Sequence, residues 1–427
     1  MLSAFRNAFK IPELRGKILF TVAIIAVYRF GSHLPVPGVD FDAVQDYLQN
    51  PAQDPSGAFT LINLFSGGAL TQFAIFALGI MPYITSSIIM QLLGVVIPRL
   101  EQLQKEGETG RKKIQQYTRY VTVFLALLQS ASIVQLAHNQ GILPLDIFPG
   151  LTPGRFALAV LTLTAGTALI MWLGELITAR GVGNGMSIII FSAIVSTLPS
   201  EGANILRVNK GFIFGLVCFL GLLIVVAVIF VEQAQRRIPV QYAKRMVGRR
   251  MYGGQSTYIP LKVNQAGVIP IIFASSLLYI PVLLSSIVNK QWLTDITERF
   301  ARTGSHPLYI ISYFLLIIGF AYFYNSIAFN PVDTADNMKK YGGFIPGIRP
   351  GRQTAEYLNH ILTRITLPGA VFLGAVAILP FIALAAGNVQ QFPFGGTSIL
   401  ITVGVGLETM KQIESQLLMR NYEGFLR

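Results

Sequence analysis

Four aliphatic residues recur at a spacing that places them on shared helix faces. Ile80 and Ile84 lie four residues apart in one hydrophobic stretch, and Met186 and Ile190 repeat that spacing later in the chain. Residues four apart meet on one face of a helix, and most such pairs simply pack in a core. Around a wet pore, a ring of these side chains would instead stop ions by dewetting and yield to a large apolar substrate.

Polar residues follow the first aliphatic pair, namely Thr85, Ser86, Ser87 and Gln91. Hydroxyl groups in helices often bond back to their own backbone. Where polar groups join two helices inside a membrane, each contributes only about 0.6 kcal/mol on average. A contact between helices that is built from such groups would therefore open at low cost.

Residues that could support catalysis or ion coupling are scattered along the chain. The histidines are far apart (His33, His138, His306 and His360), and the lone cysteine, Cys218, lies in an apolar stretch. Residues 107–113 lack the spacing of a P-loop, and no acid is clearly central in a hydrophobic segment, where ion-coupled transporters place one. We expect no enzymatic activity, no cofactor and no metal, so a partner or the substrate must supply the energy for any transport.

The elements that carry these residues are hydrophobic enough to lie in a membrane. Of the 427 residues 52% are hydrophobic and 12% are charged, whereas soluble domains have about 25% charged residues. Stretches of about 18 or more apolar residues can cross roughly 30 Å of hydrocarbon. We expect ten spans, at residues 17–34, 72–97, 120–138, 154–177, 186–199, 211–233, 264–288, 307–329, 367–386 and 397–410.

The 33 lysines and arginines are distributed unevenly between alternate loops. If the N-terminus is cytoplasmic, few of them fall outside the inner segments: Arg29, Arg155, Arg207, Lys210, Lys290, Arg299 and Arg302. The positive-inside rule then predicts that both termini are cytoplasmic. The net charge of +13 fits loops that face anionic lipids. No small-residue cleavage site follows the first span, so we expect it to remain in the mature protein.

Ten spans divide at about residues 200–210 into two sets of five, which places the second half upside down relative to the first. Residues 183–190 and 395–401 both open a span with glycine and serine followed by β-branched residues, a short echo that chance could also produce. The expected fold is an all-α polytopic membrane protein. Its ten transmembrane helices form two inverted five-helix halves, residues 1–200 and 201–427, around a central pore.

The stretch 59–96 contains a break. Residues 59–64 are apolar but too few to span a membrane, Phe65-Ser66-Gly67-Gly68 ends them, and a second helix is expected from about Thr71. Interrupted backbone at membrane depth persists only where protein or a water-filled cavity surrounds it. The short helix, at about 59–68, should therefore lie within the molecule, and a hinge at Gly67 and Gly68 would let it swing.

Two inner segments, residues 234–263 and 330–365, are long, basic and interleaved with Tyr, Phe and Pro. Arginine suits both acidic protein surfaces and phosphate, so these segments could face a partner or lipid headgroups. Their glycines and prolines indicate shaped loops, which favours docking of a partner.

Several long motifs, in order along nearly the whole chain, resemble the SecY family, the central subunit of the bacterial protein-conducting channel. The two signature regions of that family are similar to residues 65–93 and 172–191. Further similar stretches are RRIPVQYAKR at 236–245, QAGVIPIIFASS at 265–276, FIPGIRPG at 344–351 and FGGTS at 394–398.

The resemblance implies an hourglass pore between two inverted halves, closed on the outer side by a plug formed by the short helix at about 59–68. It places the pore ring at Ile80, Ile84, Met186, Ile190, Ile272 and Ile401, where Met186 departs from the usual isoleucine. Plug and hinge would comprise Leu61, Ile62, Leu64, Phe65, Gly67 and Gly68. A lateral gate toward lipid would contain Thr85, Gln91, Ser275, Ser276 and Ile280.

The resemblance also implies partners. The motor ATPase SecA or the ribosome would dock on Arg236, Arg237, Lys244, Arg245, Arg249, Arg250, Arg349 and Arg352. SecE and SecG would complete a heterotrimer in the bacterial cytoplasmic membrane, and secretory preproteins with their signal sequences would be the substrates. We therefore expect a passive, gated protein channel. A secondary transporter for a small solute and a non-transporting scaffold are the alternatives.

Overall fold

The computed structural model describes residues 9, 11–39, 66–70, 72–138, 152–208, 211–242, 245–247, 250–252, 256–287, 307–387 and 396–423. Most of these residues are helical. The helices are α2 (Pro12–Gly31), α5 (Met81–Val96), α6 (Pro98–Lys105), α7 (Glu108–His138), α8 (Pro153–Arg180), α9 (Gly185–Val208), α10 (Gly211–Gln233), α11 (Ile269–Ile287), α13 (Pro307–Ala328), α14 (Pro331–Lys340), α15 (Arg352–Gly387) and α16 (Gly396–Glu423).

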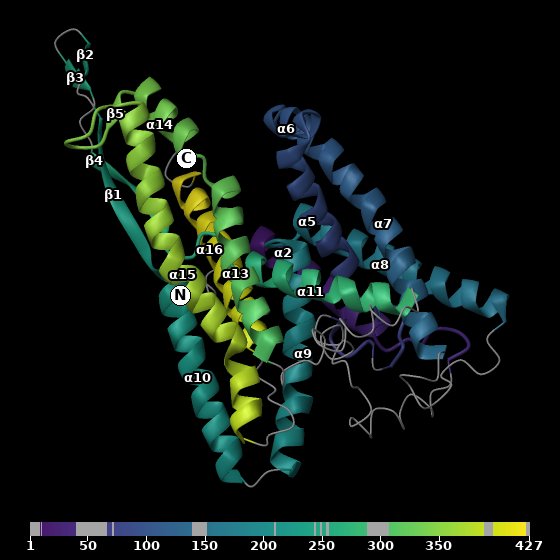
Figure 1. Ribbon diagram of the computed structural model, residues 1–427. Coiled ribbons are helices and arrows are strands. Elements are labelled where there is room, and N and C mark those ends of the chain that lie inside the picture. Colours follow the sequence, from purple (N-terminus) through teal and green to yellow (C-terminus); the bar gives the residue numbers. More distant parts are fainter. Residues whose placement is uncertain are drawn as a thin grey trace.

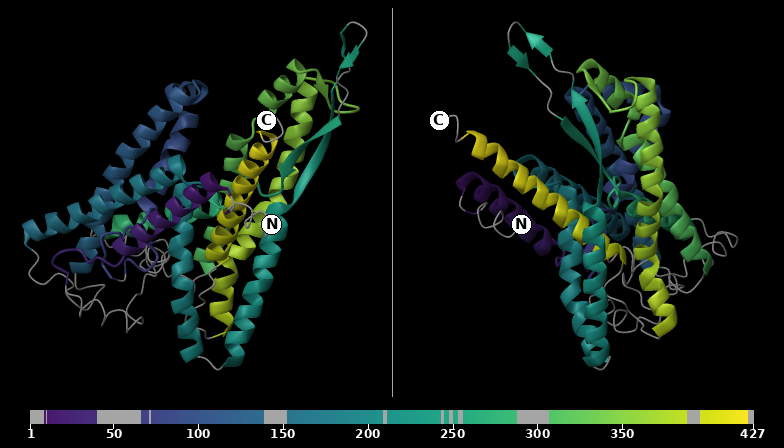
Figure 2. Two further views of the ribbon diagram at one scale, coloured as in Figure 1. Left: turned by 180° about the vertical axis from the view of Figure 1, so that it is seen from behind. Right: turned by 90° about the vertical axis from the view of Figure 1, so that its left-hand side faces the viewer.

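The helices form two groups with α9 between them (Figure 1). On one side α7 packs against both α5 and α8, and on the other α15 packs against α13 and α16. Helix α9 contacts α8 of the first group and α16 of the second, while α11 crosses from α13 to reach α5 and α7. Figure 2 shows the same grouping from behind (left-hand view). Two helices, α9 and α11, therefore join the groups.

Hydrophobicity and length identify membrane-crossing helices among the described residues. Three segments are long and apolar enough alone, namely Pro153–Arg180, Pro307–Lys340 and Arg352–Leu379, and the pair α5 and α6, bent by 101°, would count as a fourth. Shorter apolar helices cover Gly185–Pro199, Val217–Gln233 and Ile269–Leu278. The chain is thus a helical membrane protein, and its division into ten spans stays a prediction.

The expected start of the second span is wrong. The sequence suggested a helix from about Thr71, but α5 begins at Met81. Gly79 has a φ of 55°, which a helix does not tolerate, and Pro82 occupies the first turn, where its missing N–H costs nothing. The preceding backbone instead bonds to the segment after α2, through Val36 N to Phe73 O at 2.9 Å and Ile75 N to Leu34 O at 2.8 Å.

The expectation of an all-α fold is wrong for the basic segments, which also contain strands. β1 (Gln235–Tyr242) pairs antiparallel with β4 (Ser256–Lys262) and with β5 (Gly343–Phe344), while β2 (Arg245–Val247) pairs with β3 (Arg250–Tyr252). In β1 the side chains of Ile238 and Val240 are buried and their neighbours are exposed. This alternation is the period-2 pattern of a half-buried strand.

Helices α8 and α9 approach each other closely at two glycines. A Cβ atom added at Gly185 would overlap the carbonyl oxygen of Gly174. The amide of Gly185 donates to Thr178 Oγ1 at 2.9 Å. The first turn of α9 is therefore seated directly on the backbone of α8.

We predict that Gly185→Ala lowers the thermal stability of the purified protein, because overpacking of this kind typically costs about 1–3 kcal/mol. Thermal unfolding in detergent measures the change. The control is Gly406→Ala in α16, where an added Cβ meets nothing within 4 Å and the higher helix propensity of alanine is slightly stabilising. Equal midpoints for the two variants would contradict the close packing.

Candidate functional site

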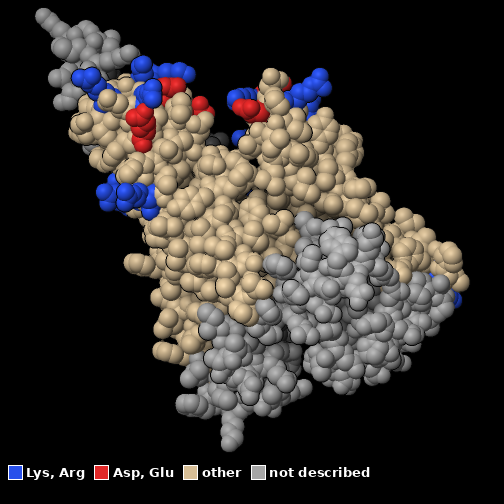
Figure 3. Space-filling view, in the orientation of Figure 1, with Lys and Arg blue, Asp and Glu red and all other residues tan. Residues whose placement is uncertain are grey.

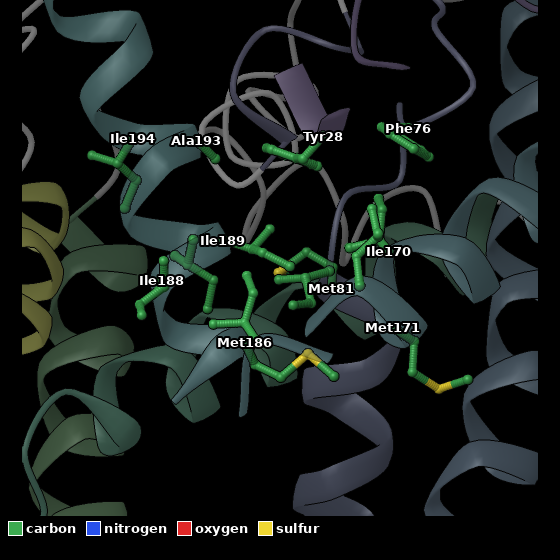
Figure 4. Packing of buried hydrophobic residues seen from close by; sticks show 14 of the residues in the cluster. Tyr28, Phe76, Met81, Ile170, Met171, Met186, Ile188, Ile189, Ala193 and Ile194 are labelled. Carbon is green, nitrogen blue, oxygen red and sulfur yellow. The ribbon is translucent and has the colours of Figure 1, made fainter. Parts of the chain in front are cut away.

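The structure brings the six predicted ring residues into one hydrophobic cluster. Ile80 and Ile84 come from the start of α5, Met186 and Ile190 from α9, Ile272 from α11 and Ile401 from α16. Five of these side chains are buried and Ile84 is half-buried. Figure 4 shows the neighbouring members of the cluster converging around Met81, Met186 and Ile189. Both groups of helices thus contribute to one apolar contact, as a seal would require.

The loop before α9 fixes the position of Met186. The Asn184 side chain accepts a hydrogen bond from the Met186 amide at 3.1 Å, as an N-cap residue does. The sulfur of Met186 lies over Gly174, where an added Cβ would overlap it. Methionine is unbranched and adapts to irregular gaps, so it fills the space that Gly174 leaves.

The predicted plug helix lies mostly outside the described residues, which include none of Leu61, Ile62, Leu64 and Phe65. The two hinge glycines are described, and both have positive φ angles, 65° at Gly67 and 86° at Gly68. Such angles favour glycine. An added Cβ at Gly67 would lie 2.8 Å from the Cα atom of Ala193, so the hinge rests on α9 one to two turns beyond Met186.

Two residues at the end of α2 also contact the hinge. Tyr28 Oη donates to Ser66 O at 3.2 Å, and Arg29 Nη1 donates to Gly67 O at 2.9 Å. From the sequence, Arg29 is noted only as one of the few basic residues outside the inner segments. A sequence signal for these contacts is lacking, because 38 residues separate the partners.

The predicted gate residues lie on helices that meet. α11 contacts α5 and α7. Thr85 Oγ1 donates to Met81 O at 2.9 Å, and Ser275 Oγ donates to Ile272 O at 2.9 Å, so both hydroxyls bond to their own helices. Gln91 is exposed, and the buried Ser276 hydroxyl has no partner among the described residues. For Ile280 only the backbone is described.

The sequence missed the polar contact that joins two helices here. Ser86 Oγ donates to the carbonyl oxygen of Thr118 in α7 at 2.7 Å, and both residues are buried. This bond ties α5 to α7, the helix that α11 also contacts. Among the described residues no hydrogen bond joins Thr85 or Gln91 to Ser275 or Ser276.

The two predicted docking segments form one body. Ile238, Leu261, Met338, Ile345 and Leu358 share a small core that draws on β1, β4, α14 and α15. Because β5 also pairs with β1, joining Gln241 to Phe344 and Tyr242 to Gly343, segments that are far apart in the chain are fixed together. The charges they carry are thus held on a folded surface and not on separate loops.

Most described docking residues are exposed on this body. Arg236 and Arg237 lie on β1, with the Arg237 guanidinium 4.9 Å from the centroid of the Tyr258 ring. Arg349 is exposed in the turn before α15, and Arg352 pairs with Glu356 at 2.9 Å. The remaining predicted docking residues have described backbone only (Arg245 and Arg250) or lie outside the described residues (Lys244 and Arg249).

A second basic tip, formed by α6, faces this body across a notch at the same end of the molecule (Figure 3). In α6, Lys105 Nζ contacts Glu101 at 2.7 Å. That hydrogen bond raises the pKa of Lys105, and the negative charge of Asp333 in α14 adds to the effect more weakly.

Two acidic residues near span ends, Glu175 and Glu232, have hydrogen-bond partners. Glu175 accepts from Arg119 Nε at 2.7 Å, and Glu232 accepts from Asn264 Nδ2 at 2.5 Å. In the part of the chain that the structure describes, no three His, Cys, Asp or Glu residues gather in a way that could hold a metal ion.

Comparison with known sequences identifies the family to which the chain belongs. The model of the SecY family matches residues 74–410. The chain is 59% identical over 439 residues to the protein translocase subunit SecY of Streptomyces galbus, and 56% identical over 441 residues to that of Mycobacterium tuberculosis, with full coverage of each chain. The chain therefore belongs to the SecY family, and the resemblance read from its motifs is confirmed.

Solved structures share the fold. A protein-conducting channel aligns with a TM-score of 0.63 at 18% sequence identity, covering 93% of this chain and 91% of that one. Sec61 in a canine ribosome-channel complex aligns with a TM-score of 0.59 over the same shares. The helical fold is thus that of SecY and Sec61 channels. The relatives in this family are named as subunits of a protein translocase, and these names do not refer to catalysis.

If the aliphatic cluster excludes water, a polar side chain within it should admit ions. We predict that Ile190→Asn raises the passive ion permeability of liposomes that contain the protein at least several-fold, because a polar group reverses dewetting. The control is Val332→Asn on the exposed surface of α14. Unchanged permeability in a folded Ile190 variant would mean that the cluster is a structural core only.

Proposed function

We propose that this protein is the passive, gated channel for unfolded secretory preproteins in the bacterial cytoplasmic membrane, and that it releases membrane helices sideways into the lipid. One observation carries the proposal: six aliphatic residues predicted to ring a pore meet in a single buried cluster at the contact between both groups of helices. Membership of the translocase family supports the same function.

The proposed architecture is ten transmembrane helices in two inverted halves, residues 1–200 and 201–427, with both termini cytoplasmic. The basic body and the basic tip of α6 support this orientation because they share one end of the molecule (Figure 3), as inner loops should. Anionic lipids would contact the same end.

In the proposed cycle, the apolar helix of a signal sequence enters at the gate, which lies between α5 and α7 on one side and α11 and α13 on the other, where the predicted polar contacts are weak. The plug formed by residues of about 59–68 then leaves, and the aliphatic ring widens around the chain. Aliphatic contacts are non-directional, so ring side chains can exchange contacts with each other for contacts with the passing polypeptide.

Directed motion would come from partners. SecA or the ribosome would bind the exposed arginines of the basic body, and SecE and SecG would complete the complex. A ribosome complex is described for the structurally similar canine Sec61. The folded, arginine-bearing surface supports this role, because arginine recognises both acidic protein surfaces and RNA phosphate.

Crosslinking tests the path of the polypeptide. In a Cys218→Ser background, single cysteines at Ile84 and Ile272 should both form adducts with a preprotein that a folded C-terminal tag stalls midway. A cysteine at Leu161, which is exposed on α8, serves as the lipid-facing control. Absence of adducts in a complex that still exports preprotein would place the path elsewhere.

Charge reversal tests docking. We predict that Arg349→Glu reduces motor-driven transport at least ten-fold, because one reversed charge at a protein interface costs more than one lost contact, while the idle ion permeability stays unchanged. The turn itself should persist, since Thr354 Oγ1 donates to the backbone oxygen of Arg349 at 2.9 Å. Arg155→Glu, on the opposite side of the membrane in the proposed topology, is the matched control. Normal transport by the Arg349 variant would remove this residue from the docking site.

A further inference from the structure

The strands of the basic body are tied at their base to the two membrane helices from which they arise. Strand β1 follows α10 directly, and β4 leads into α11 through residues 263–268 (Figure 1). At this base Asn264 Nδ2 donates to Glu232 Oε1 of α10 at 2.5 Å and to Gly267 O at 3.1 Å. The amide of Val263 donates to Ala234 O at 3.0 Å. One side chain thus joins the end of α10 to the segment that begins α11.

The joining contact lies mostly out of water. Asn264 is 5% exposed, and Glu232 is half-buried. Loss of the Glu232 carboxyl group would leave the Asn264 amide buried with one hydrogen bond fewer, and a buried polar group without a partner costs more free energy than a typical hydrogen bond contributes. The contact therefore holds the two chain segments together more firmly than a bond on the surface would.

The segment 263–268 is also packed against two further helices. A Cβ atom at Gly369 of α15 would lie 2.6 Å from Val263 O, and a Cβ atom at Gly404 of α16 would lie 3.2 Å from Val268 Cγ1. The carbonyl of Val268 accepts the amide of Ile272 at 3.3 Å, so the first turn of α11 follows this segment directly. The start of α11 is therefore fixed between α10, α15 and α16.

Helix α11 carries residues of both the aliphatic cluster and the predicted gate. Ile272 belongs to the cluster, and Ser275 and Ser276 follow it by one turn. Gly267 has a φ of 60°, a conformation that favours glycine, and it is a point at which the chain could bend. Because Asn264 bonds on both sides of this point, to Glu232 and to Gly267 O, it opposes a bend that would let the strands tilt without moving α11.

We propose that Glu232 and Asn264 are positioning residues that couple the basic body to α11. Force that a docked partner applies to β1 and β4 then moves the start of α11, and with it the predicted gate. The inference rests on the proposed channel function and assigns the residues through which docking acts on the pore. The role is one of transmission, so the affinity for the partner does not depend on it.

The experiment uses the channel assembled with SecE and SecG in liposomes, with SecA as the motor. It measures the Kd for SecA, the rate of preprotein transport and the ATP hydrolysed per transported preprotein. Glu232→Ala removes the acceptor, Asn264→Ala removes the donor, and Glu232→Gln keeps an acceptor oxygen at the same reach. Glu414→Ala, at an exposed position of α16, is the matched control.

We expect the ATP hydrolysed per preprotein to rise about five-fold in each of the two alanine variants, as the loss of one buried hydrogen bond implies, with an unchanged Kd for SecA. The double variant should be no worse than either single one, because residues that act through one contact are not additive. Glu232→Gln should restore most of the coupling, and Glu414→Ala should behave as the wild type. A merely structural role would lower the yield of folded complex without raising the ATP hydrolysed per preprotein.

Unchanged ATP hydrolysis per preprotein in both alanine variants would overturn the coupling role and leave the channel function intact. A Glu232→Gln variant as impaired as Glu232→Ala would overturn it too, because the charge and not the hydrogen bond would then be the cause. If the alanine variants do not accumulate, Glu232→Asp decides, since it keeps the charge and withdraws the acceptor by one methylene group; normal coupling in that variant would contradict the proposal. A wild-type complex that transports no preprotein with SecA would instead contradict the proposed function.

Discussion

The structure depends on the close seating of α9 on α8. The carbonyl of Gly174 occupies the place that a side chain at Gly185 would need, so any larger residue would push the first turn of α9 away from α8. With α9 packed this closely, Met186 and Ile190 lie in the aliphatic cluster and Ala193 lies against Gly67. On its other side the loop at Gly183 meets Thr409 of α16. The position of α9 on α8 is therefore linked to the aliphatic cluster, to Gly67 and to the contact with the second group of helices.

Two kinds of interaction close this site, and their physical character differs. The aliphatic cluster is stabilised by burial of apolar surface, which is non-directional and tolerates a change of partner. The hinge is held by hydrogen bonds, which weaken steeply when the donor and acceptor lose alignment. In the proposed channel, a widening ring would therefore lose its contacts gradually, whereas the hydrogen bonds at Ser66 and Gly67 would each be lost over a small displacement.

The sequence predicted the features that follow from local patterns. Spacing of four marked Ile80 with Ile84 and Met186 with Ile190, and the structure unites them with Ile272 and Ile401. Local patterns failed where distant segments decide the conformation. The first residues of the expected second span bond to the chain after α2 and so do not form a helix, and Phe344 completes a strand pair with Gln241. The contacts of Tyr28 and Arg29 with the hinge likewise join positions that share no periodicity.

The convergence of the basic segments bears on how a partner could act on the pore. Separate loops could bind a partner but would pass little of its movement on to the membrane helices, because each loop would move independently. The core of Ile238, Met338 and Leu358 instead joins β1, α14 and α15, and α15 continues without a break from Arg352 to Gly387. Helix α15 packs against α16, which carries Ile401 into the aliphatic cluster. In the proposed channel, a partner that displaces the basic body would therefore act on helices that connect it to the aliphatic cluster.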